Sequence, residues 1–192
     1  QPVNQIEDYI IIKNNIPKKT CQSLINTCNN RKWNKHEWNN YTTGEFTSES
    51  TKELDVMSSS KEQEVKVKPF IVKALEEYQK KCTWGGVKPT EKPTWLTRFS
   101  SIRFNKYEVG SMMRGHYDHI HTLFDGTIKG IPIVSIVANL NEDYEGAEFY
   151  CRDKIIPLTT GDILLFPSNF MFPHGVTECT KGTRYSFVSW AF

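Results

Sequence analysis

The sequence predicts an α+β protein that is mainly β, in which N-terminal helices precede an antiparallel β core of the sandwich or barrel type. Three observations predict this fold class. Apolar residues recur at helical spacing near residues 21–28 and 67–75, short apolar runs follow one another closely after residue 95, and turn residues separate those runs. The length of 192 residues and the 38% hydrophobic content suit one domain with a sizeable core.

The N-terminal segment begins with a short strand and a helix. Residues 9–13 form an apolar run that favours a strand. Asn15 and Pro17 are typical of a helix start, because proline is tolerated in the first helical turn. Four residues at spacing i, i+3, i+4 and i+7 then predict one buried helix face: Cys21, Leu24, Ile25 and Cys28.

Residues 31–60 are polar and show little periodicity, so we expect either a long surface loop or a short irregular hairpin. The segment carries Trp33, His36 and Trp38. These side chains either form a lid over a binding site or belong to a merely ordered loop.

A second helix is predicted to run to about Cys82. Two pairs fit the capping box that starts a helix: Ser59 with Glu62, and Ser60 with Gln63. Pro69 must either kink this helix or mark its true first turn. Glycine and proline in residues 85–93 then indicate a turn-rich link.

The C-terminal half is predicted to consist of strands. Residues 95–104 alternate, and 107–110 form a turn. Further strands are expected at 133–140, 146–151, 154–158, 163–166, 175–178 and 184–192. Turn signals separate them at 125–126, 141–146, 160–162 and 181–182.

The composition limits the cellular setting and the partners. Five cysteines without a CxxC pair indicate free thiols in a reducing compartment, so we expect a cytoplasmic protein. Eighteen lysines against six arginines, with abundant asparagine, suggest a microbial or virus-infected cell. No apolar run approaches the roughly 18 residues that would span a membrane. Residues 61–106 carry eleven basic and five acidic residues, which leaves nucleic acid possible as a partner. A solvated, lysine-rich helix face is the commoner cause of such a balance.

Three residues have the pattern of a metal site. His116 and Asp118 form an HxD triplet, whose side chains share one face of an extended segment, and His174 follows 58 residues later. Two histidines and one carboxylate leave open coordination positions, as in the facial triad of non-haem Fe(II) oxygenases. Arg184 and Ser186 share a face of a strand expected to pair near His174, and they can hold a carboxylate together. A metal triad beside a carboxylate clamp describes a site for a keto acid.

These residues resemble the 2-oxoglutarate/Fe(II)-dependent dioxygenases, and most closely the prolyl 4-hydroxylase group. Tyr107, Gly110, His116 and Asp118 match that group's Tyr-x-x-Gly…His-x-Asp pattern. Residues 146–149 (GAEF), 161–166 (GDILLF) and 174–175 (HG) resemble its later strands. The resemblance implies a double-stranded β-helix (jelly roll) and a single domain over 1–192. Residues 1–94 would be helical support and a variable loop, and 95–192 the core.

The resemblance also implies roles for individual residues. His116, Asp118 and His174 would bind Fe(II), and 2-oxoglutarate and O2 would take the remaining positions. Arg184 would pair with the distal carboxylate of 2-oxoglutarate, helped by Ser186 and Tyr107. Ascorbate (vitamin C) is the expected reductant. Phe149, Leu164 and Phe166 are candidates for apolar walls.

The sequence departs from the group's pattern at some positions. Met113 stands where the group has a second tyrosine, and Ala138 and Asn139 stand where it often has tyrosine. Arg184 replaces the lysine of collagen-type enzymes. Arginine is the anchor of the hypoxia-sensing type, which also shares Trp190.

The expected reaction is hydroxylation of a prolyl residue in a peptide or protein, with conversion of 2-oxoglutarate to succinate and CO2. Alternatives are the same chemistry on a free amino acid, nucleobase or small metabolite, and a non-catalytic metal-binding β-sandwich module. Arg103, Trp190 and His121 are candidates for substrate contacts. The segments 31–60 and 119–131 are expected to select the substrate.

Overall fold

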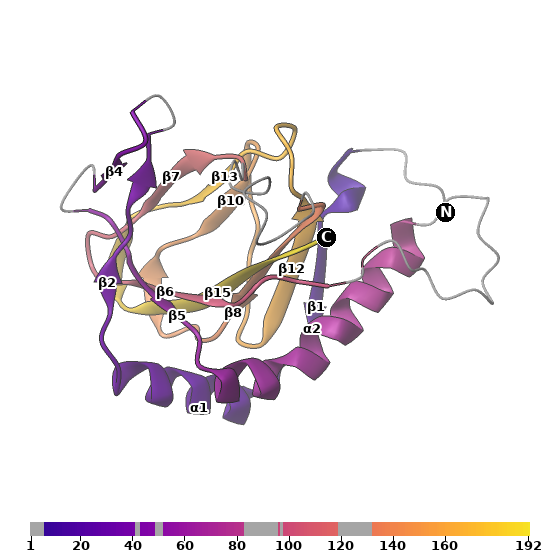
Figure 1. The fold of residues 1–192 in the computed structure, drawn as a ribbon, viewed down its shortest axis with the longest axis horizontal. Coiled ribbons are helices and arrows are strands. Elements are labelled where there is room, and N and C mark those ends of the chain that lie inside the picture. Colours follow the sequence, from indigo (N-terminus) through magenta and orange to yellow (C-terminus); the bar gives the residue numbers. More distant parts are fainter. Residues whose placement is uncertain (1–5, 41–42, 49–51, 83–95, 97, 119–131) are drawn as a thin grey trace.

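The computed structural model describes residues 6–40, 43–48, 52–82, 96, 98–118 and 132–192. The predicted link at 85–93, the turn at 125–126 and His121 lie outside the described residues. Within them, the fold is mainly β, with two antiparallel sheets packed face to face in a jelly roll and two α-helices beside them (Figure 1).

The larger sheet has seven strands. In spatial order they are β1 Ile11–Asn14, β12 Asp162–Pro167, β8 Val134–Asn139, β15 Arg184–Ala191, β6 Arg103–Tyr107, β5 Asp55–Ser58 and β2 Asn34–Lys35. The smaller sheet has four strands, in the order β11 Lys154–Ile155, β10 Phe149–Cys151, β13 His174–Val176 and β7 Met113–His116. Two further pairs are β14 Cys179–Gly182 with β9 Tyr144–Gly146, and β3 Trp38–Asn39 with β4 Phe46–Thr47.

Alternation along the central strands separates two apolar cores. Ile136 and Ala138 of β8 pack in the core that includes the helices, whereas Val137 packs in the core between the sheets. Ile163 of β12 belongs to the helix-side core, and Leu164 to the other. Because successive side chains of a strand point to opposite faces, the buried apolar runs serve both layers at once.

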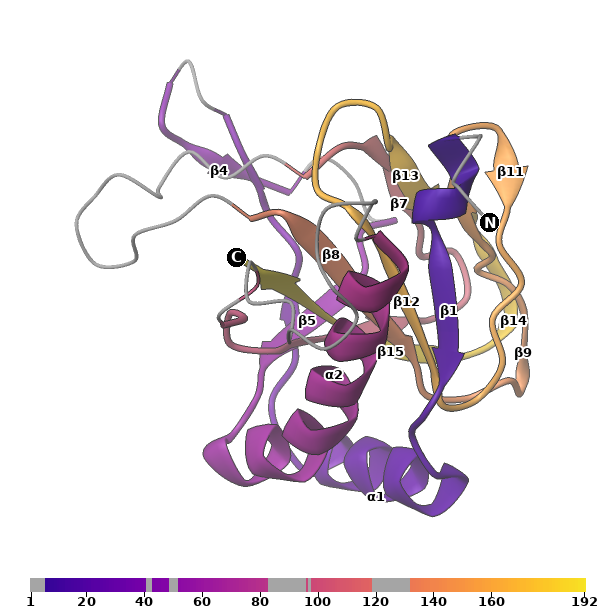
Figure 2. The same ribbon diagram turned by 90° about the vertical axis from the view of Figure 1, so that its right-hand side faces the viewer.

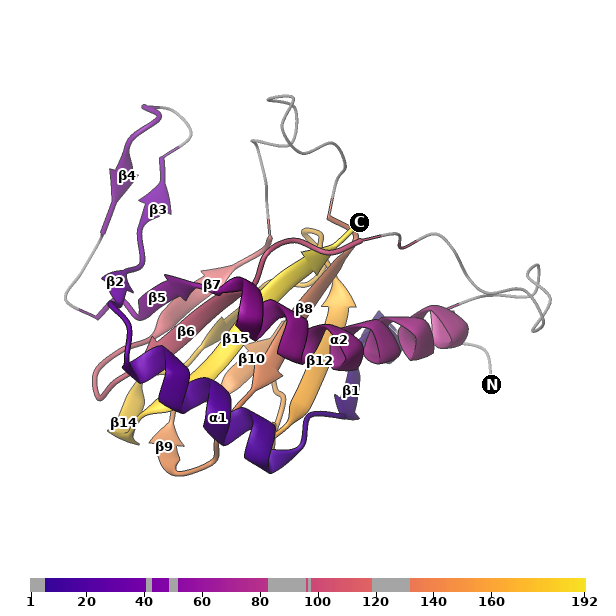
Figure 3. The same cartoon turned by 60° about the horizontal axis from the view of Figure 1, so that its bottom comes forward.

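The helices α1 Lys18–Asn29 and α2 Lys61–Cys82 cover the outer face of the seven-stranded sheet (Figures 1 and 3). In Figure 2 the helices lie at the bottom of the molecule, and β7 and β13 lie at the top. The predicted α1 is confirmed, with Pro17 at its N-cap. Its buried residues are the four expected from the spacing: Cys21, Leu24, Ile25 and Cys28.

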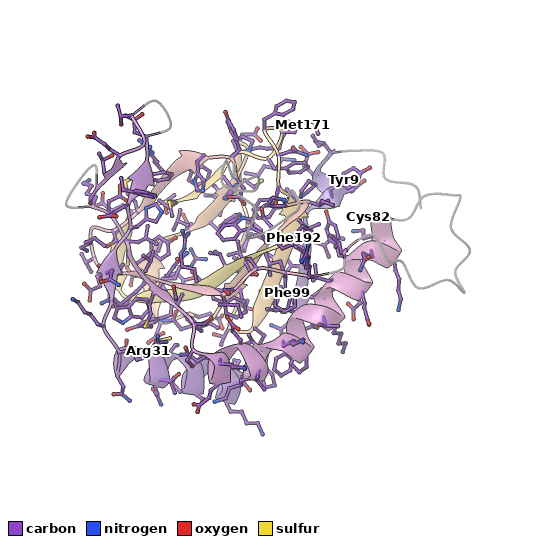
Figure 4. The ribbon with its side chains drawn as sticks, in the orientation of Figure 1. Tyr9, Arg31, Cys82, Phe99, Met171 and Phe192 are labelled. Atoms are coloured by element: carbon purple, nitrogen blue, oxygen red, sulfur yellow. The ribbon has the colours of Figure 1, made fainter. Side chains whose placement is uncertain are left out.

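The start of α2 confirms one of the two predicted capping boxes. The Ser60 backbone N–H donates to Gln63 Oε1 at 2.9 Å, and the Gln63 N–H donates to Ser60 Oγ at 3.3 Å. Ser59 does not pair with Glu62 in this way and donates to Glu64 Oε1 instead. Arg31, labelled in Figure 4, follows α1. Its Nη1 donates to Gln63 Oε1 at 2.9 Å, so the cap connects the two helices.

Pro69 lies inside α2, so the expectation that it could mark the first turn is wrong. The helix begins eight residues earlier because the Ser60 cap satisfies its first backbone donors. Tyr78 near the other end is buried, and its hydroxyl donates to the backbone oxygen of Tyr9 at 3.0 Å. Tyr9 itself ends a 3-10 helix, Ile6–Tyr9, so the first strand starts at Ile11 and not at residue 9.

Residues 31–60 differ most from expectation, because their described part, without 41–42 and 49–51, contains four short strands. The pairing of β3 with β4 agrees with the expected short hairpin, whereas β2 and β5 were not predicted. β5 pairs with β6 along four residues and so extends the main sheet. β3 and β4 form a separate two-stranded ribbon that stands away from that sheet (Figure 3). β5 could not be predicted from an apolar run, because only Met57 of its four residues is fully buried.

The C-terminal strands are found near their predicted positions, with some differences. β6 starts at Arg103, so residues 98–102 are not a regular strand. Gly146 and Ala147 have φ of +69° and +47°, and this break divides the predicted strand 146–151 into β9 and β10. β7 and β14 were missed, and β14 includes the predicted 181–182 turn. Within the described part of the chain, no helix is long and apolar enough to cross a membrane.

Gly161 provides a test of this packing. Its φ is +90°, and an added Cβ would lie 2.1 Å from the backbone oxygen of Ile16. Gly110 has φ +88° with nothing within 4 Å of such a Cβ. We expect Gly161→Ala to lower the free energy of unfolding by about 3 kcal/mol or more. The matched control Gly110→Ala, which adds only left-handed strain, should cost about 1–2 kcal/mol. Chemical denaturation measures both, and equal losses would contradict the packing at Gly161.

Candidate functional site

The residues of the predicted metal triad lie together between the two sheets. His116 ends β7, His174 begins β13, and the two residues are directly opposite in the strand register. Asp118 follows β7 by two residues. One ligand atom from each of the three side chains lies within 4.8 Å of the others. Asp118 Oδ1 is 3.8 Å from His116 Nε2 and 3.6 Å from His174 Nε2, so the three side chains can hold one metal ion.

Backbone carbonyls orient both imidazoles. His116 Nδ1 lies 2.9 Å from the Arg114 oxygen, and His174 Nδ1 lies 3.0 Å from the Phe172 oxygen. A carbonyl oxygen only accepts, so in each ring Nδ1 carries the hydrogen and Nε2 presents its lone pair. Burial, followed by the neighbouring His174, lowers the pKa of His116 to about 4. His116 is therefore neutral near pH 7, which is the form that binds metals.

Asp118 is oriented by two donors from the larger sheet. Its Oδ2 accepts from Trp190 Nε1 at 2.8 Å and from the Ser135 hydroxyl. Ser135 is itself hydrogen-bonded to Ser168 at 2.7 Å. Both donors leave Oδ1 directed at the histidines. The sequence offered Trp190 only as a substrate candidate and did not single out Ser135.

The described pocket beside the triad contains the predicted carboxylate clamp. Its lining comes from both sheets and includes Tyr107, Arg184 and Ser186 as well as the three triad residues. β15, which was expected to pair near His174, lies in the other sheet from β13. It pairs with β6 and β8, so Arg184 faces the triad across the sandwich from the opposite sheet.

Arg184 is a buried cation with an unused donor. It is 1% exposed, its Nε donates to Asn139 Oδ1 at 2.9 Å, and its guanidinium lies 5.4 Å from the Tyr107 ring centre. Its Nη1 has no hydrogen-bond partner among the described residues. A buried guanidinium with an unpaired N–H is costly unless an anion completes it. The pocket is therefore suited to a carboxylate.

Asn139 replaces a frequent tyrosine of the resembling group and has a structural role here. Its Oδ1 accepts from Arg184, and its Nδ2 donates to the Asn141 backbone oxygen at 2.8 Å. This arrangement holds the guanidinium toward the pocket. The contact between Asn139 and Arg184 depends on the pairing of β8 with β15, in which Asn139 lies opposite Ser186.

The apolar walls are partly as predicted. The Phe149 ring stacks on His174 with centroids 5.7 Å apart, and Phe166 meets the same ring edge-on at 4.7 Å. Met113, at the predicted tyrosine position, is buried and lines the pocket. Leu164 lies in the core between the sheets and not in the pocket lining. The segment before His174 carries Met171 at the upper edge of the molecule (Figure 4).

The predicted lid residues separate into two groups. The Trp38 ring meets His116 edge-on at 5.4 Å, and its Nε1 donates to Glu53 Oε1 at 2.8 Å. His36 packs against Trp38 at 4.8 Å, and burial lowers its pKa to about 3. Trp33 packs instead near Tyr185, on the helix-side core. Trp38 and His36 thus adjoin the site, whereas Trp33 does not.

Of the three substrate candidates, two line the pocket and one lies outside the described residues. Arg103 donates from Nε to Asn105 Oδ1 at 3.1 Å, and its guanidinium lies 5.7 Å from the Trp190 ring centre. Both residues line the same pocket as the triad. His121 falls in the segment 119–131, which is not described.

A jelly roll with two histidines, one carboxylate and a buried arginine facing them is the architecture of a 2-oxoglutarate/Fe(II)-dependent dioxygenase. Residues 102–192 match the family model of the 2OG-Fe(II) oxygenase superfamily, and this segment includes the triad and the clamp. This match supports a 2-oxoglutarate-dependent dioxygenase for the segment 102–192, which is slightly less than half of the chain. No curated protein sequence matches the chain.

Solved structures share the fold at low sequence identity. A prolyl-4-hydroxylase from Pseudomonas putida is 19% identical with a TM-score of 0.65, covering 95% of this chain and 92% of that one. A prolyl hydroxylase from Trichoplax adhaerens, in complex with a hypoxia inducible factor peptide fragment, is 16% identical with a TM-score of 0.66, covering 96% and 84%. A viral collagen prolyl hydroxylase from Paramecium Bursaria Chlorella virus-1, described as a 2OG complex, is 14% identical with a TM-score of 0.61, covering 95% and 94%.

The triad predicts a metal dependence that can be measured by itself. We expect His174→Ala to weaken Fe(II) or Co(II) binding by at least about tenfold, because one of three protein ligands is removed. The control His36→Ala removes a nearby buried histidine outside the triad and should bind the metal nearly as well as the unmodified protein. Calorimetric titration under anaerobic conditions measures both affinities. Equal affinities in all three proteins would exclude His174 as a ligand.

The hydrogen bond from Trp190 to Asp118 predicts a second effect on metal affinity. Trp190→Phe keeps an aromatic ring beside Arg103 but removes the hydrogen bond to Asp118 Oδ2. We expect metal affinity to fall by about tenfold, since a partner that orients a ligand typically contributes that much. The same titration checks it. An unchanged affinity, with an unchanged melting temperature, would show that Ser135 alone orients Asp118.

Proposed function

We propose that this chain hydroxylates a prolyl residue in a peptide or protein, using Fe(II), O2 and 2-oxoglutarate. Overall, one O2, one 2-oxoglutarate and one C–H bond would give succinate, CO2 and the alcohol. The observation that carries the proposal is the buried Arg184, which lines the same pocket as the His116, Asp118 and His174 cluster and whose Nη1 has no hydrogen-bond partner among the described residues.

The chain's own residues would have distinct roles in this reaction. His116, Asp118 and His174 would hold Fe(II) through two imidazole Nε2 atoms and one carboxylate oxygen. When bound, the metal and 2-oxoglutarate supply the oxidising chemistry, in which one oxygen atom enters succinate and the other enters the substrate. Three protein ligands leave coordination positions open for the cosubstrate, which a closed structural site lacks.

Arg184 would bind the distal carboxylate of 2-oxoglutarate. A guanidinium offers parallel N–H donors that match a carboxylate, and Ser186 and Tyr107 line the same end of the pocket with hydroxyl groups. Asn139 would position Arg184 by accepting from its Nε. Phe149 and Met113 would help to exclude water from the reacting groups.

Support for a prolyl substrate comes from the structural relatives, which are described as prolyl hydroxylases, one of them with a peptide bound. A free amino acid, nucleobase or small metabolite remains the alternative substrate, and nucleic acid is disfavoured. Trp38, which touches His116, supports a role for residues 31–60 in contacting the substrate. Ascorbate is the proposed reductant, and residues 1–192 are proposed to act as one domain.

Five free cysteines support a reducing compartment, and we therefore propose a cytoplasmic location. Four of the five are buried. Burial raises the pKa of Cys21, Cys28 and Cys151 to about 11, which keeps these thiols protonated and unreactive.

The proposed reaction predicts succinate formation that depends on Arg184. With Fe(II), ascorbate and 2-oxoglutarate, we expect succinate to form, and a pool of proline-containing peptides to gain about 16 Da per hydroxylation. Arg184→Gln should raise KM for 2-oxoglutarate by about tenfold or more, because a charged partner of the carboxylate is lost. Arg152→Gln removes an arginine from the surface near Glu7 and should leave KM unchanged.

Several outcomes would contradict the proposal. The absence of succinate when bound metal has been verified would exclude the oxygenase reaction. Mass gain in an oligonucleotide pool but not in peptides would replace the prolyl substrate with a nucleobase. For a non-catalytic metal module, the affinity for Fe(II) would be independent of 2-oxoglutarate, whereas the proposed site predicts that each ligand strengthens binding of the other.

A further inference from the structure

The pocket contains a second arginine that the proposed binding of Fe(II) and 2-oxoglutarate does not use. Arg103 lies on β6 and lines the pocket together with the triad and Arg184. Its described contacts are a hydrogen bond from Nε to Asn105 Oδ1 and stacking of its guanidinium over Trp190 at 5.7 Å. Neither contact neutralises its charge.

No carboxylate among the described residues forms an ion pair with Arg103. Asp118 is the one acidic residue in the described lining of the pocket. Its Oδ2 is already occupied by Trp190 and Ser135, and its Oδ1 faces the two histidines. Asp118 therefore acts on Arg103 electrostatically without forming an ion pair. A partly buried guanidinium that no carboxylate contacts is typical of a site that receives an anion.

Arg103 and Arg184 lie toward opposite ends of the pocket. In the antiparallel pairing of β6 with β15, Arg184 is opposite Tyr107 and Val188 is opposite Arg103. The two opposed pairs are four residues apart on each strand. This offset corresponds to about 13 Å along the sheet. The Arg103 guanidinium lies over Trp190, which contacts Asp118. Arg103 is therefore at the end of the pocket away from the proposed anchor of 2-oxoglutarate.

Among the described residues that line the pocket, the charges of the proposed complex are incomplete without a further anion. Fe(II) carries two positive charges, which the 2-oxoglutarate dianion balances. Asp118 balances one of the two arginines, and both histidines ligate as neutral groups. One positive charge remains on the partly buried Arg103, where an unpaired charge is unfavourable.

We infer that Arg103 binds a carboxylate of the substrate, so that the chain selects substrates with a carboxylate close to the carbon that is hydroxylated. This inference rests on the proposed function and specifies its substrate class. The carboxylate has two possible sources with the same chemistry. One is the side chain of an acidic residue beside the proline, and the other is the free α-carboxylate of a terminal proline.

Matched probes test this inference on the complete chain with Fe(II), ascorbate and 2-oxoglutarate. The first pair is acetyl-Ala-Pro-Asp-amide and acetyl-Ala-Pro-Asn-amide, which differ in charge but hardly in shape. The second is N-acetyl-L-proline and its primary amide. We expect the anionic member of one pair to have a kcat/KM for hydroxylation about tenfold to a hundredfold higher. The pair that shows the preference identifies the source of the carboxylate.

Variants of Arg103 assign the preference to this residue. R103Q should abolish the preference for the anionic probe, and R103K should keep part of it because the charge remains. The surface control R152Q should keep all of it. KM for 2-oxoglutarate should change less than about threefold in R103Q, in contrast to the rise expected for Arg184→Gln. Melting curves verify that each variant is folded.

Three results would overturn the inference. One is equal use of the charged and neutral probes, including the case in which none is hydroxylated. Another is a preference that persists in R103Q. The third is a rise of about tenfold or more in KM for 2-oxoglutarate in R103Q with the preference unchanged, which would assign Arg103 to the cosubstrate. Succinate formation without any probe tests the proposed function separately.

Discussion

The pairing of β7 with β13 is the constraint on which the site depends. It places His116 and His174 opposite one another, although 58 residues separate them in the chain. Gly175 makes this close arrangement possible, because a Cβ at that position would lie 2.4 Å from the Tyr150 hydroxyl and 2.7 Å from the Met113 oxygen. A larger residue there would move the strand that carries His174, and the two imidazoles would no longer converge on Asp118.

The two sheets contribute different parts of the candidate site. The smaller sheet carries the two histidines, whereas the larger sheet carries Arg184 and the donors that orient Asp118. The pocket therefore exists only where the sheets face each other. The helices on the outer face support this arrangement because their apolar residues pack on the same strands whose other face forms the pocket wall.

Much of the fold was predictable, and the errors have identifiable physical causes. The helix α1, the Ser60 cap and the apolar strands β8, β12 and β15 have strong local patterns, so sequence periodicity was sufficient. The strand β5 is polar because it lies near the edge of the sheet, and β7 contains Arg114 and Gly115 in place of an apolar run. Strands of this kind are held by pairing with neighbours, which local sequence does not encode.

The sequence by itself determined the residue types of the site. The HxD triplet, the distal histidine and the Arg-x-Ser pair have the donor set for a metal and a carboxylate, so their roles could be predicted from functional-group chemistry. Tertiary structure decided which of these groups meet and what orients them. Ser135, Asn139 and Trp38 have ordinary sequence surroundings, yet each contacts a predicted site residue. Such contacts depend on strand register and on the packing of one sheet against the other, because hydrogen bonds and ring contacts act over a few ångströms between residues far apart in the chain.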